Sequence, residues 1–247
     1  MSRRTLIVGD QFSEFCTEDS TITLCQFQNR VDSNDVDGQE FIVGQGIKHD
    51  EVARLSEPVD NQGHSIIPRQ PLAQMALTHK HEEKNVLISE PVKQHARLFT
   101  LEMMLNDESD RLVDHVTGKH IGGMVLVEAA RQASIACSEI ALEIDTKEVK
   151  QGFIWKSMNV EFKRFVFPAP TDIKVEIIIH EDSTDDKTVM STVVTFIQNA
   201  KELCTITNDF DVTASSFISK VESRSAEKLI LDMTSSIDES ADKKCAA

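Results

Sequence analysis

The chain has 247 residues, with 26 basic and 41 acidic side chains and a formal net charge of −15 at pH 7. Hydrophobic residues make up 40% of it, enough for a buried core in one sizeable domain with extensions or in two small domains. A chain this acidic argues against a nucleic-acid partner, which needs a basic face. The five cysteines form no CxxC pair, and their odd number does not indicate a disulfide framework.

The N-terminal sequence MSRRTLIVGDQF contains an apolar run of only three residues, which is too short for a signal peptide. A later apolar stretch, residues 124–142, is about as long as a membrane span. It nevertheless carries Glu128, Arg131, Gln132 and Glu139. We therefore expect a cytoplasmic protein without a membrane span.

The first seventy residues predict short strands at Thr5–Val8, Thr21–Phe27 and Phe41–Val43. Residues 32–38 (DSNDVDG) predict a polar turn, because the glycine and distal glutamate of a calcium loop are missing from the required positions. Prolines and a glycine crowd residues 57–71, which favours a linker and a domain boundary there.

The pattern becomes regular after residue 71. A short strand and a longer one are expected first, and four runs rich in Val, Ile, Phe and Thr follow the apolar stretch. Their predicted bounds are Asn85–Ser89, Gln94–Leu105, Gly152–Val166, Asp172–Glu181, Thr188–Gln198 and Leu203–Val212. The short connections between the last four favour antiparallel neighbours.

Between these strands lies the stretch around which the rest is organised, residues 114–143. It begins as a glycine-punctuated loop and becomes almost continuously apolar from Met124 to Leu142. Its Ala, Leu, Met, Glu and Gln content, without an internal Gly or Pro, favours a helix of roughly 30 Å. A helix that is apolar nearly all round is a buried helix.

Two strands, one buried helix and four strands predict an α+β hot-dog fold, in which a curved antiparallel sheet wraps round a long apolar helix. We place this domain at residues 71–214. Residues 1–70 form an N-terminal region of unclear structure, for which a degenerate hot-dog half is one alternative. Residues 215–247 are polar apart from Leu229–Leu231 and predict a short helix and a loose tail.

Three stretches carry a family resemblance. DHVTGKHIGGMVLVEAARQAS, from Asp114, resembles the core motif of the A-factor (γ-butyrolactone) biosynthesis hot-dog domain family. LTHKHEEKNVLISEP at Leu77–Pro91 and MNVEFKRFVFPAP at Met158–Pro170 are also similar to that family. Family members studied as butyrolactone synthases resemble two such domains fused, whereas this chain shows one clear copy, so we expect a homodimer.

A wider resemblance concerns the site. The order of His115, Gly118, Gly123, Glu128 and Gln132 is similar to that in hot-dog 3-hydroxyacyl-carrier-protein dehydratases, where a loop histidine faces a helix carboxylate. The loop here is one residue shorter, and Thr117 and Gly122 replace its prolines. What the resemblance implies is an acyl-thioester pocket, with Gln132 among the substrate-binding residues.

Glu128 and Arg131 are the first candidates for chemistry because they interrupt the apolar helix. Burial would raise the pKa of Glu128 and suit it to proton transfer near neutrality, unless Arg131 offsets the effect. The alternative is a structural carboxylate held by the helix dipole or by Arg131. Arg131, or else Lys80, is expected to bind the negative charge of an acceptor.

The loop before the helix supplies further candidates. His115 suits a general acid/base or carbonyl-orienting role, or else caps the loop, and His120 is a second substrate-contacting candidate. Gly122 and Gly123 allow a ligand to approach the backbone, and amides at a helix start can stabilise an oxyanion. The alternative for this glycine pair is simply a tight turn.

The pair His79 and Lys80 predicts a substrate-phosphate or a structural role. His79 and His81 form an HxH pattern without an evident third ligand, so neither a metal nor another cofactor is expected. Lys163 and Arg164 offer another cationic patch for phosphate, although exposed strand cations also simply keep a surface soluble.

The resemblance implies an acyltransferase of secondary metabolism. It would move a β-ketoacyl group from acyl-carrier protein or acyl-CoA to a hydroxyl of a small phosphorylated, glycerone-phosphate-like acceptor, on the way to a butyrolactone. The alternatives are an acyl-thioester hydrolase or 3-hydroxyacyl dehydratase that uses the same pocket, and a non-catalytic acyl- or lactone-binding subunit.

Overall fold

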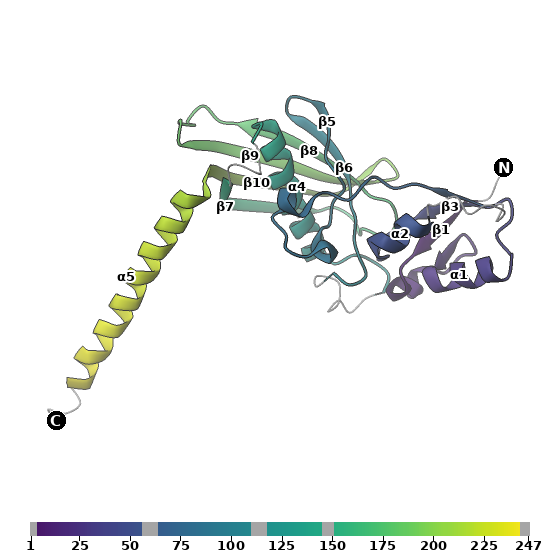
Figure 1. The fold of residues 1–247 in the computed structure, drawn as a ribbon, viewed down its shortest axis with the longest axis horizontal. Coiled ribbons are helices and arrows are strands. Elements are labelled where there is room, and N and C mark those ends of the chain that lie inside the picture. Colours follow the sequence, from purple (N-terminus) through teal and green to yellow (C-terminus); the bar gives the residue numbers. More distant parts are fainter. Residues whose placement is uncertain (1–3, 56–63, 110–117, 145–150, 243–247) are drawn as a thin grey trace.

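The computed structural model describes residues 4–55, 64–109, 118–144 and 151–242, so His115 lies outside the described residues. Figure 1 shows two sheets side by side and a long C-terminal helix that extends away from them. The smaller sheet has the strand order β2-β1-β3-β4, and the larger one has the order β5-β6-β8-β9-β10-β7.

The smaller sheet belongs to the N-terminal unit, residues 4–67. Its strands are β1 (Arg4–Val8), β2 (Thr21–Thr23), β3 (Glu40–Val43) and β4 (Ser65–Ile67); its helical elements are η1 (Asp10–Phe15), α1 (Leu24–Asp32) and α2 (His49–Leu55). All of its pairings are parallel. A degenerate hot-dog half would instead be antiparallel.

The strand predicted at Thr21–Phe27 stops after three residues because a helix begins there. The Thr23 hydroxyl accepts a hydrogen bond from the Gln26 amide, and the Gln26 side chain accepts one from the Thr23 amide. This reciprocal capping box starts α1. The prediction is therefore wrong for residues 24–27.

The larger sheet is antiparallel throughout and forms what we call the antiparallel unit. Its strands are β5 (Val92–His95), β6 (Leu98–Glu102), β7 (Gln151–Phe162), β8 (Asp172–Ile179), β9 (Lys187–Gln198) and β10 (Lys201–Ala214). The last four confirm the predicted strands to within a few residues. The predicted strand Gln94–Leu105 is wrong because the chain turns at Ala96–Arg97 and pairs β5 with β6. Residues 85–89 contribute only isolated bridges instead of a strand.

Helix α4 (Gly123–Ala141) confirms the predicted buried helix. It packs against β7, β8, β9 and β10 and against the short helix α3 (Met75–Thr78), which the 3-10 turn η2 (Glu83–Asn85) follows. Buried hydroxyl groups fix it to the sheet: the hydroxyls of Ser134 and Thr192 lie 2.7 Å apart, and the Asn208 amide donates to Ser134 at 3.0 Å. The middle of α4 is thereby held at a defined place on the sheet.

The N-terminal unit docks on the antiparallel unit through the carboxyl ends of its own strands. Gln45, fully buried just after β3, donates to the Met103 carbonyl at 2.9 Å and accepts from the Leu105 amide at 2.8 Å. A side chain at Gly44 would collide with the Pro168 carbonyl at 2.3 Å. In parallel α/β sheets this edge ordinarily binds ligands, but here the antiparallel unit occupies it.

Helix α5 (Ser215–Asp242) corrects the expectation of a short helix and a loose tail. It extends away from both sheets (Figure 1), with Leu229, Ile230 and Leu231 exposed. Three consecutive apolar residues point in different directions round a helix, so no single apolar stripe marks it in the sequence. Good helix formers such as Ala, Glu, Lys, Leu and Met between residues 226 and 233 favour it instead.

Candidate functional site

Glu128 is buried on α4 and is surrounded by donors. The Arg131 guanidinium donates to both of its carboxylate oxygens at 2.9 and 3.0 Å. The Lys80 ammonium lies 2.5 Å from Oε1, and the Gln132 amide donates to the same oxygen at 3.1 Å. We call these four residues the Glu128 cluster. The structure thus brings together four of the residues predicted for the site.

The donors of the Glu128 cluster determine the pKa of its carboxyl group. Burial alone would raise the pKa of Glu128, but the hydrogen bonds from Arg131, Lys80 and Gln132 outweigh it and lower that pKa to about 2. Of the two expectations for Glu128, the one in which Arg131 offsets the effect of burial therefore holds. A carboxylate with so low a pKa stays ionised and is a weak base.

The remaining contacts of this helix face connect it to the segment before β5. The Gln132 side chain donates to the Asn85 carbonyl and accepts from the Leu87 amide, both at 2.9 Å. His79, on the same segment, places Nε2 2.9 Å from the buried Glu139 carboxylate. Successive helical residues are 100° apart, so Glu128, Gln132 and Glu139 share one face of α4. His79 and Lys80 thus both pair with carboxylates of α4, although His79 itself stays exposed.

A pocket of about 1230 Å³ lies at the start of α4, on a different face of that helix. Gly123 and Leu126 line it from α4, together with residues 162–167 at and just after the end of β7. Around the β9–β10 turn it is lined by Gln198, Asn199, Lys201 and Leu203. Leu126 is about 200° round the helix from Glu128. The pocket and the Glu128 cluster are therefore separate parts of the molecule.

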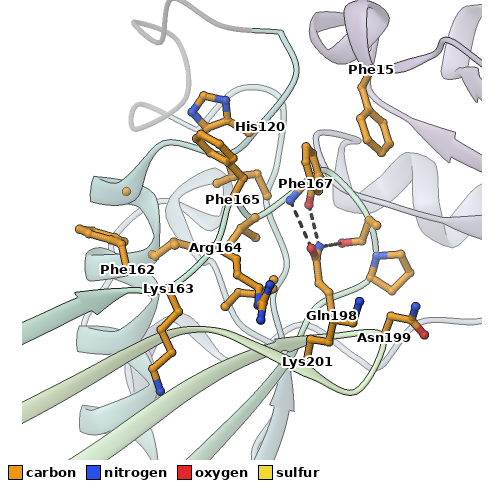
Figure 2. A pocket seen from close by; sticks show the side chains of 17 residues that line it. Phe15, His120, Phe162, Lys163, Arg164, Phe165, Phe167, Gln198, Asn199 and Lys201 are labelled. Carbon is orange, nitrogen blue, oxygen red and sulfur yellow. Dashed lines mark hydrogen bonds between the residues drawn. The ribbon is translucent and has the colours of Figure 1, made fainter.

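Aromatic rings form much of the pocket wall. Phe162 and Phe165 are exposed although large and apolar, with 56% and 67% of their surface accessible, and Phe167 lies beside them (Figure 2). Phe15, from the N-terminal unit, stacks on Phe167 with ring centroids 5.5 Å apart. Both units of the chain therefore build the pocket.

The loop into α4 supplies the polar side of this wall. The His120 ring lies 4.9 Å from the Phe165 ring, centroid to centroid, and the Ile121 amide donates to the Val166 carbonyl. The N-cap residue Gly122 has no side chain that could cap the helix, and the first turn of α4 holds no acidic residue. A side chain at Gly123 would come within 2.8 Å of the Phe162 ring. The glycine therefore allows the first turn of α4 to approach the aromatic wall closely.

Of the predicted site residues that the structure describes, His120 and Gly123 line the pocket, with Gly122 adjacent. Lys163 and Arg164, which the sequence offered as a cationic patch, line it as well. Phe15, Gln198 and Lys201 were missed because only the folded chain brings them to the motif. The signal available for Phe162, Phe165 and Phe167 was their clustering within six residues of the MNVEFKRFVFPAP stretch.

Two negative findings apply to the described residues. No group of three or more His, Cys, Asp or Glu side chains within them is placed to hold a metal ion. None of the helices in the described ranges is long and apolar enough to cross a membrane.

Solved structures with similar folds are distant. A mutant of thioesterase PA1618 from Pseudomonas aeruginosa is 14% identical, covers 58% of this chain and 94% of its own, and has a TM-score of 0.42. A hypothetical thioesterase with coenzyme A from Streptococcus pneumoniae TIGR4 is 16% identical over 51% of this chain and 85% of its own, with a TM-score of 0.35. The protein smu.793 from Streptococcus mutans UA159, bound to acetyl-CoA, is 12% identical over 51% of this chain and 88% of its own, with a TM-score of 0.36. Likenesses at TM-scores this low establish neither the activity nor the ligand of this chain.

A search of curated proteins gave no match. The family described as the A-factor biosynthesis hotdog domain matches residues 63–214, which is more than half of the chain. This range contains α4, the six strands of the antiparallel sheet and all of the pocket except Phe15. The chain belongs to the A-factor biosynthesis hotdog domain family.

Proposed function

We propose that the protein handles acyl thioesters in the pocket at the start of α4. The specific activity we propose is transfer of a β-ketoacyl group from acyl-CoA or acyl-carrier protein to a hydroxyl of a glycerone-phosphate-like acceptor. The observation that carries the proposal is an apolar, aromatic-lined pocket of about 1230 Å³ at an uncapped helix start within a hotdog-family domain. The antiparallel sheet would curve round α4 as in other hot-dog folds.

The proposed chemistry uses the loop and the first turn of α4. The acyl chain would lie among Phe162, Phe165 and Leu126, with the thioester carbonyl oxygen accepting from the Gly123 and Met124 amides. The acceptor oxygen would attack the carbonyl carbon, a C–O bond forming as the C–S bond breaks. His120 would take the hydroxyl proton and return it to the leaving thiolate. His115 stays a predicted partner in this step.

The Glu128 cluster would have a supporting role. It holds α3 and residues 79–87 against α4, which keeps the helix in position while the opposite face meets the substrate. The catalytic role predicted for Glu128 and Arg131, and the substrate-binding role predicted for Lys80, His79 and Gln132, remain predictions. We expect the structural role for all five, because their side chains already pair with each other or with neighbouring groups.

A second candidate function is a non-catalytic acyl- or lactone-binding subunit. The observation that favours it is the low pKa of Glu128, because the strongest candidate base in the family-like motif is held as an ion pair. A hydrolase or dehydratase remains the other enzymatic alternative, and water or a 3-hydroxyacyl chain would then take the place of the acceptor.

Incubation with a β-ketoacyl-CoA, with and without dihydroxyacetone phosphate, separates these functions when products are identified by mass spectrometry. We expect an acyl ester and free coenzyme A only when both substrates are present. Release of coenzyme A at the same rate with and without dihydroxyacetone phosphate indicates a hydrolase. Saturable binding without product indicates the binding subunit and contradicts the proposed transfer.

The role of His120 is tested in the same assay. His120→Gln should lower turnover by roughly a hundredfold or more, the usual range for losing a general acid or base. His95→Gln is the matched control, since His95 is exposed on β5 and does not line the pocket. Equal turnover in the two variants would exclude proton transfer by His120.

A further inference from the structure

The charges around the pocket differ from those of the whole chain. Acidic residues outnumber basic ones by 41 to 26 in the chain. Among the described residues, however, those that line the pocket include Lys163, Arg164 and Lys201 and no Asp or Glu. A purely apolar ligand does not require three cations in such an acidic protein. The composition of the lining therefore indicates a ligand with negative charge.

The three cations are not equivalent. Lys163 forms ion pairs with Glu202 at 2.9 Å and Glu161 at 3.7 Å, so its charge is already matched. The side chains of Arg164 and Lys201 make no ion pair or hydrogen bond with any residue in the described part of the chain. Figure 2 shows the Arg164 side chain extending toward Gln198 and Lys201. These two cations are available to a ligand.

The backbone that carries both cations is held in place. The Arg164 amide donates to the Leu203 carbonyl at 3.0 Å, which joins the segment after β7 to β10. The Gln198 side chain bonds both backbone groups of Phe167 and the Thr171 hydroxyl, at 2.8 to 3.2 Å. Asn199 and Ala200, which separate Gln198 from Lys201, are both left-handed, with φ of 48° and 58°. Arg164 and Lys201 therefore stand on two segments that are bonded together.

We propose that Arg164 and Lys201 form an anion subsite that binds a phosphate group of the ligand in this pocket. The guanidinium can donate two parallel hydrogen bonds to a phosphate, and the ammonium adds a point charge beside it. This inference rests on the proposed function, because it names the charged part of the ligand whose acyl part lies among the phenylalanines. It also replaces Arg131 and Lys80 in the phosphate role, since both of these contact Glu128.

Two sources of this phosphate have the same chemistry. One is the thioester donor, whose coenzyme A or carrier-protein arm carries phosphate esters, and the other is a phosphorylated acceptor. Binding of each is measured directly by calorimetry, so the test does not need turnover. The probes are coenzyme A and pantetheine for the donor, and dihydroxyacetone phosphate and dihydroxyacetone for the acceptor.

The variants are Arg164→Gln and Lys201→Gln, with Arg97→Gln and Lys93→Gln as matched controls on the exposed β5–β6 hairpin. We expect each pocket variant to weaken binding of one phosphorylated probe about tenfold and the double variant to weaken it further. The phosphate-free counterpart and both controls should bind as the unmodified protein does. Loss confined to coenzyme A assigns the phosphate to the donor, and loss confined to dihydroxyacetone phosphate assigns it to the acceptor.

The inference is overturned if the pocket variants bind every probe as tightly as their controls, or lose affinity equally for phosphorylated and phosphate-free probes. A failed transfer assay with a selective loss of phosphate binding contradicts only the proposed reaction. Unfolding curves of the variants should match those of the controls, because neither side chain makes an ion pair or a side-chain hydrogen bond with another described residue.

Discussion

Glu128 illustrates how neighbouring residues set the chemistry of one side chain. The sequence places a carboxylate on an apolar helix, where burial favours the protonated form. Lys80 lies 48 positions away in the chain, yet its ammonium reaches the Glu128 carboxylate in the fold. Arg131 could be anticipated from its spacing, but the contribution of Lys80 could not. The sequence therefore predicts a charged residue of importance without predicting its pKa.

We expect Glu128→Gln to lower stability rather than activity. The substitution leaves the partly buried Lys80 and Arg131 without a counter-charge, which should cost about 1–2 kcal/mol, less than for a fully buried pair. In a domain of this size this is a fall in Tm of roughly 2–8 °C. Thermal unfolding with Glu227→Gln on exposed α5 as the control measures it. A normal Tm together with a hundredfold loss of turnover would show instead that Glu128 is catalytic.

The low pKa of Glu128 also gives a pH dependence with a defined sign. Its folded pKa of about 2 lies below the ordinary value of 4.5, so the stabilisation is complete above pH 4.5 and is lost as pH falls toward 2.

His49, between the two units, titrates in a higher pH range. Burial and the nearby charge of Arg69 lower the pKa of His49 from 6.5 to about 4.

For His49 we expect stability to fall as the pH is lowered from 6.5 to 4, because the unfolded chain binds the proton more readily than the folded one. The effect is at most about 3 kcal/mol for a shift of this size. His49→Gln should remove this part of the pH dependence and leave the part below pH 4.5. If the free energy of unfolding changed equally with pH between 4 and 6.5 in the unmodified protein and in His49→Gln, the pH dependence would not come from His49.

Among the helices and strands, those with a long regular pattern were predictable, whereas the points at which one element gives way to another were not. The strands β7 to β10 follow from runs of β-branched and aromatic residues, and α4 follows from a long apolar stretch without Gly or Pro. The capping box at Thr23 and Gln26 ends β2 within a run that resembles a strand. The β5–β6 turn likewise interrupts an alternating pattern without a Gly or Pro to mark it. Tertiary pairing and local caps decide such places.

The short helical turn η1 ends in Phe15, which brings the N-terminal unit to the pocket wall. We expect Phe15→Ala to enlarge the pocket and to shift preference toward longer or bulkier acyl groups by several-fold in relative affinity. The exposed Phe217 on α5 provides the matched control, Phe217→Ala. Titration with acyl-CoA of increasing chain length measures the shift. An unchanged preference would mean that the N-terminal unit does not contact the acyl chain.

At the scale of the whole molecule, the pocket could not be predicted because it joins distant parts of the sequence. Its wall takes side chains from four segments: residue 15, the loop and first turn of α4, the residues after β7, and the β9–β10 turn. The family-like motif does lie at the pocket, because His120 and Gly123 line it. The sequence alone could not show that the pocket and Glu128 lie on different faces of α4. The docking of the N-terminal unit through Gln45 had no local signature either.

The edge strand β7 supports the expectation of a homodimer. It lies at the end of the larger sheet, and Ile154, Met158 and Phe162 along it are exposed. An uncovered apolar edge of this kind favours pairing with a second copy. We expect twice the chain mass at micromolar concentration in light scattering, and the chain mass for the double variant Ile154→Lys and Met158→Lys. Ile178→Lys on the interior strand β8 is the control. A monomeric mass for the unmodified protein would contradict this arrangement.

We expect acyl thioesters to bind at the start of α4 and not at the Glu128 cluster. The decisive measurement is a crystal structure with a non-hydrolysable thioether analogue of a β-ketoacyl-CoA. We expect the acyl chain among Phe162, Phe165 and Leu126, with its carbonyl oxygen within hydrogen-bond distance of the Gly123 or Met124 amide. An acyl group bound against Lys80, Glu128 and Arg131, with the pocket left empty, would contradict the claim.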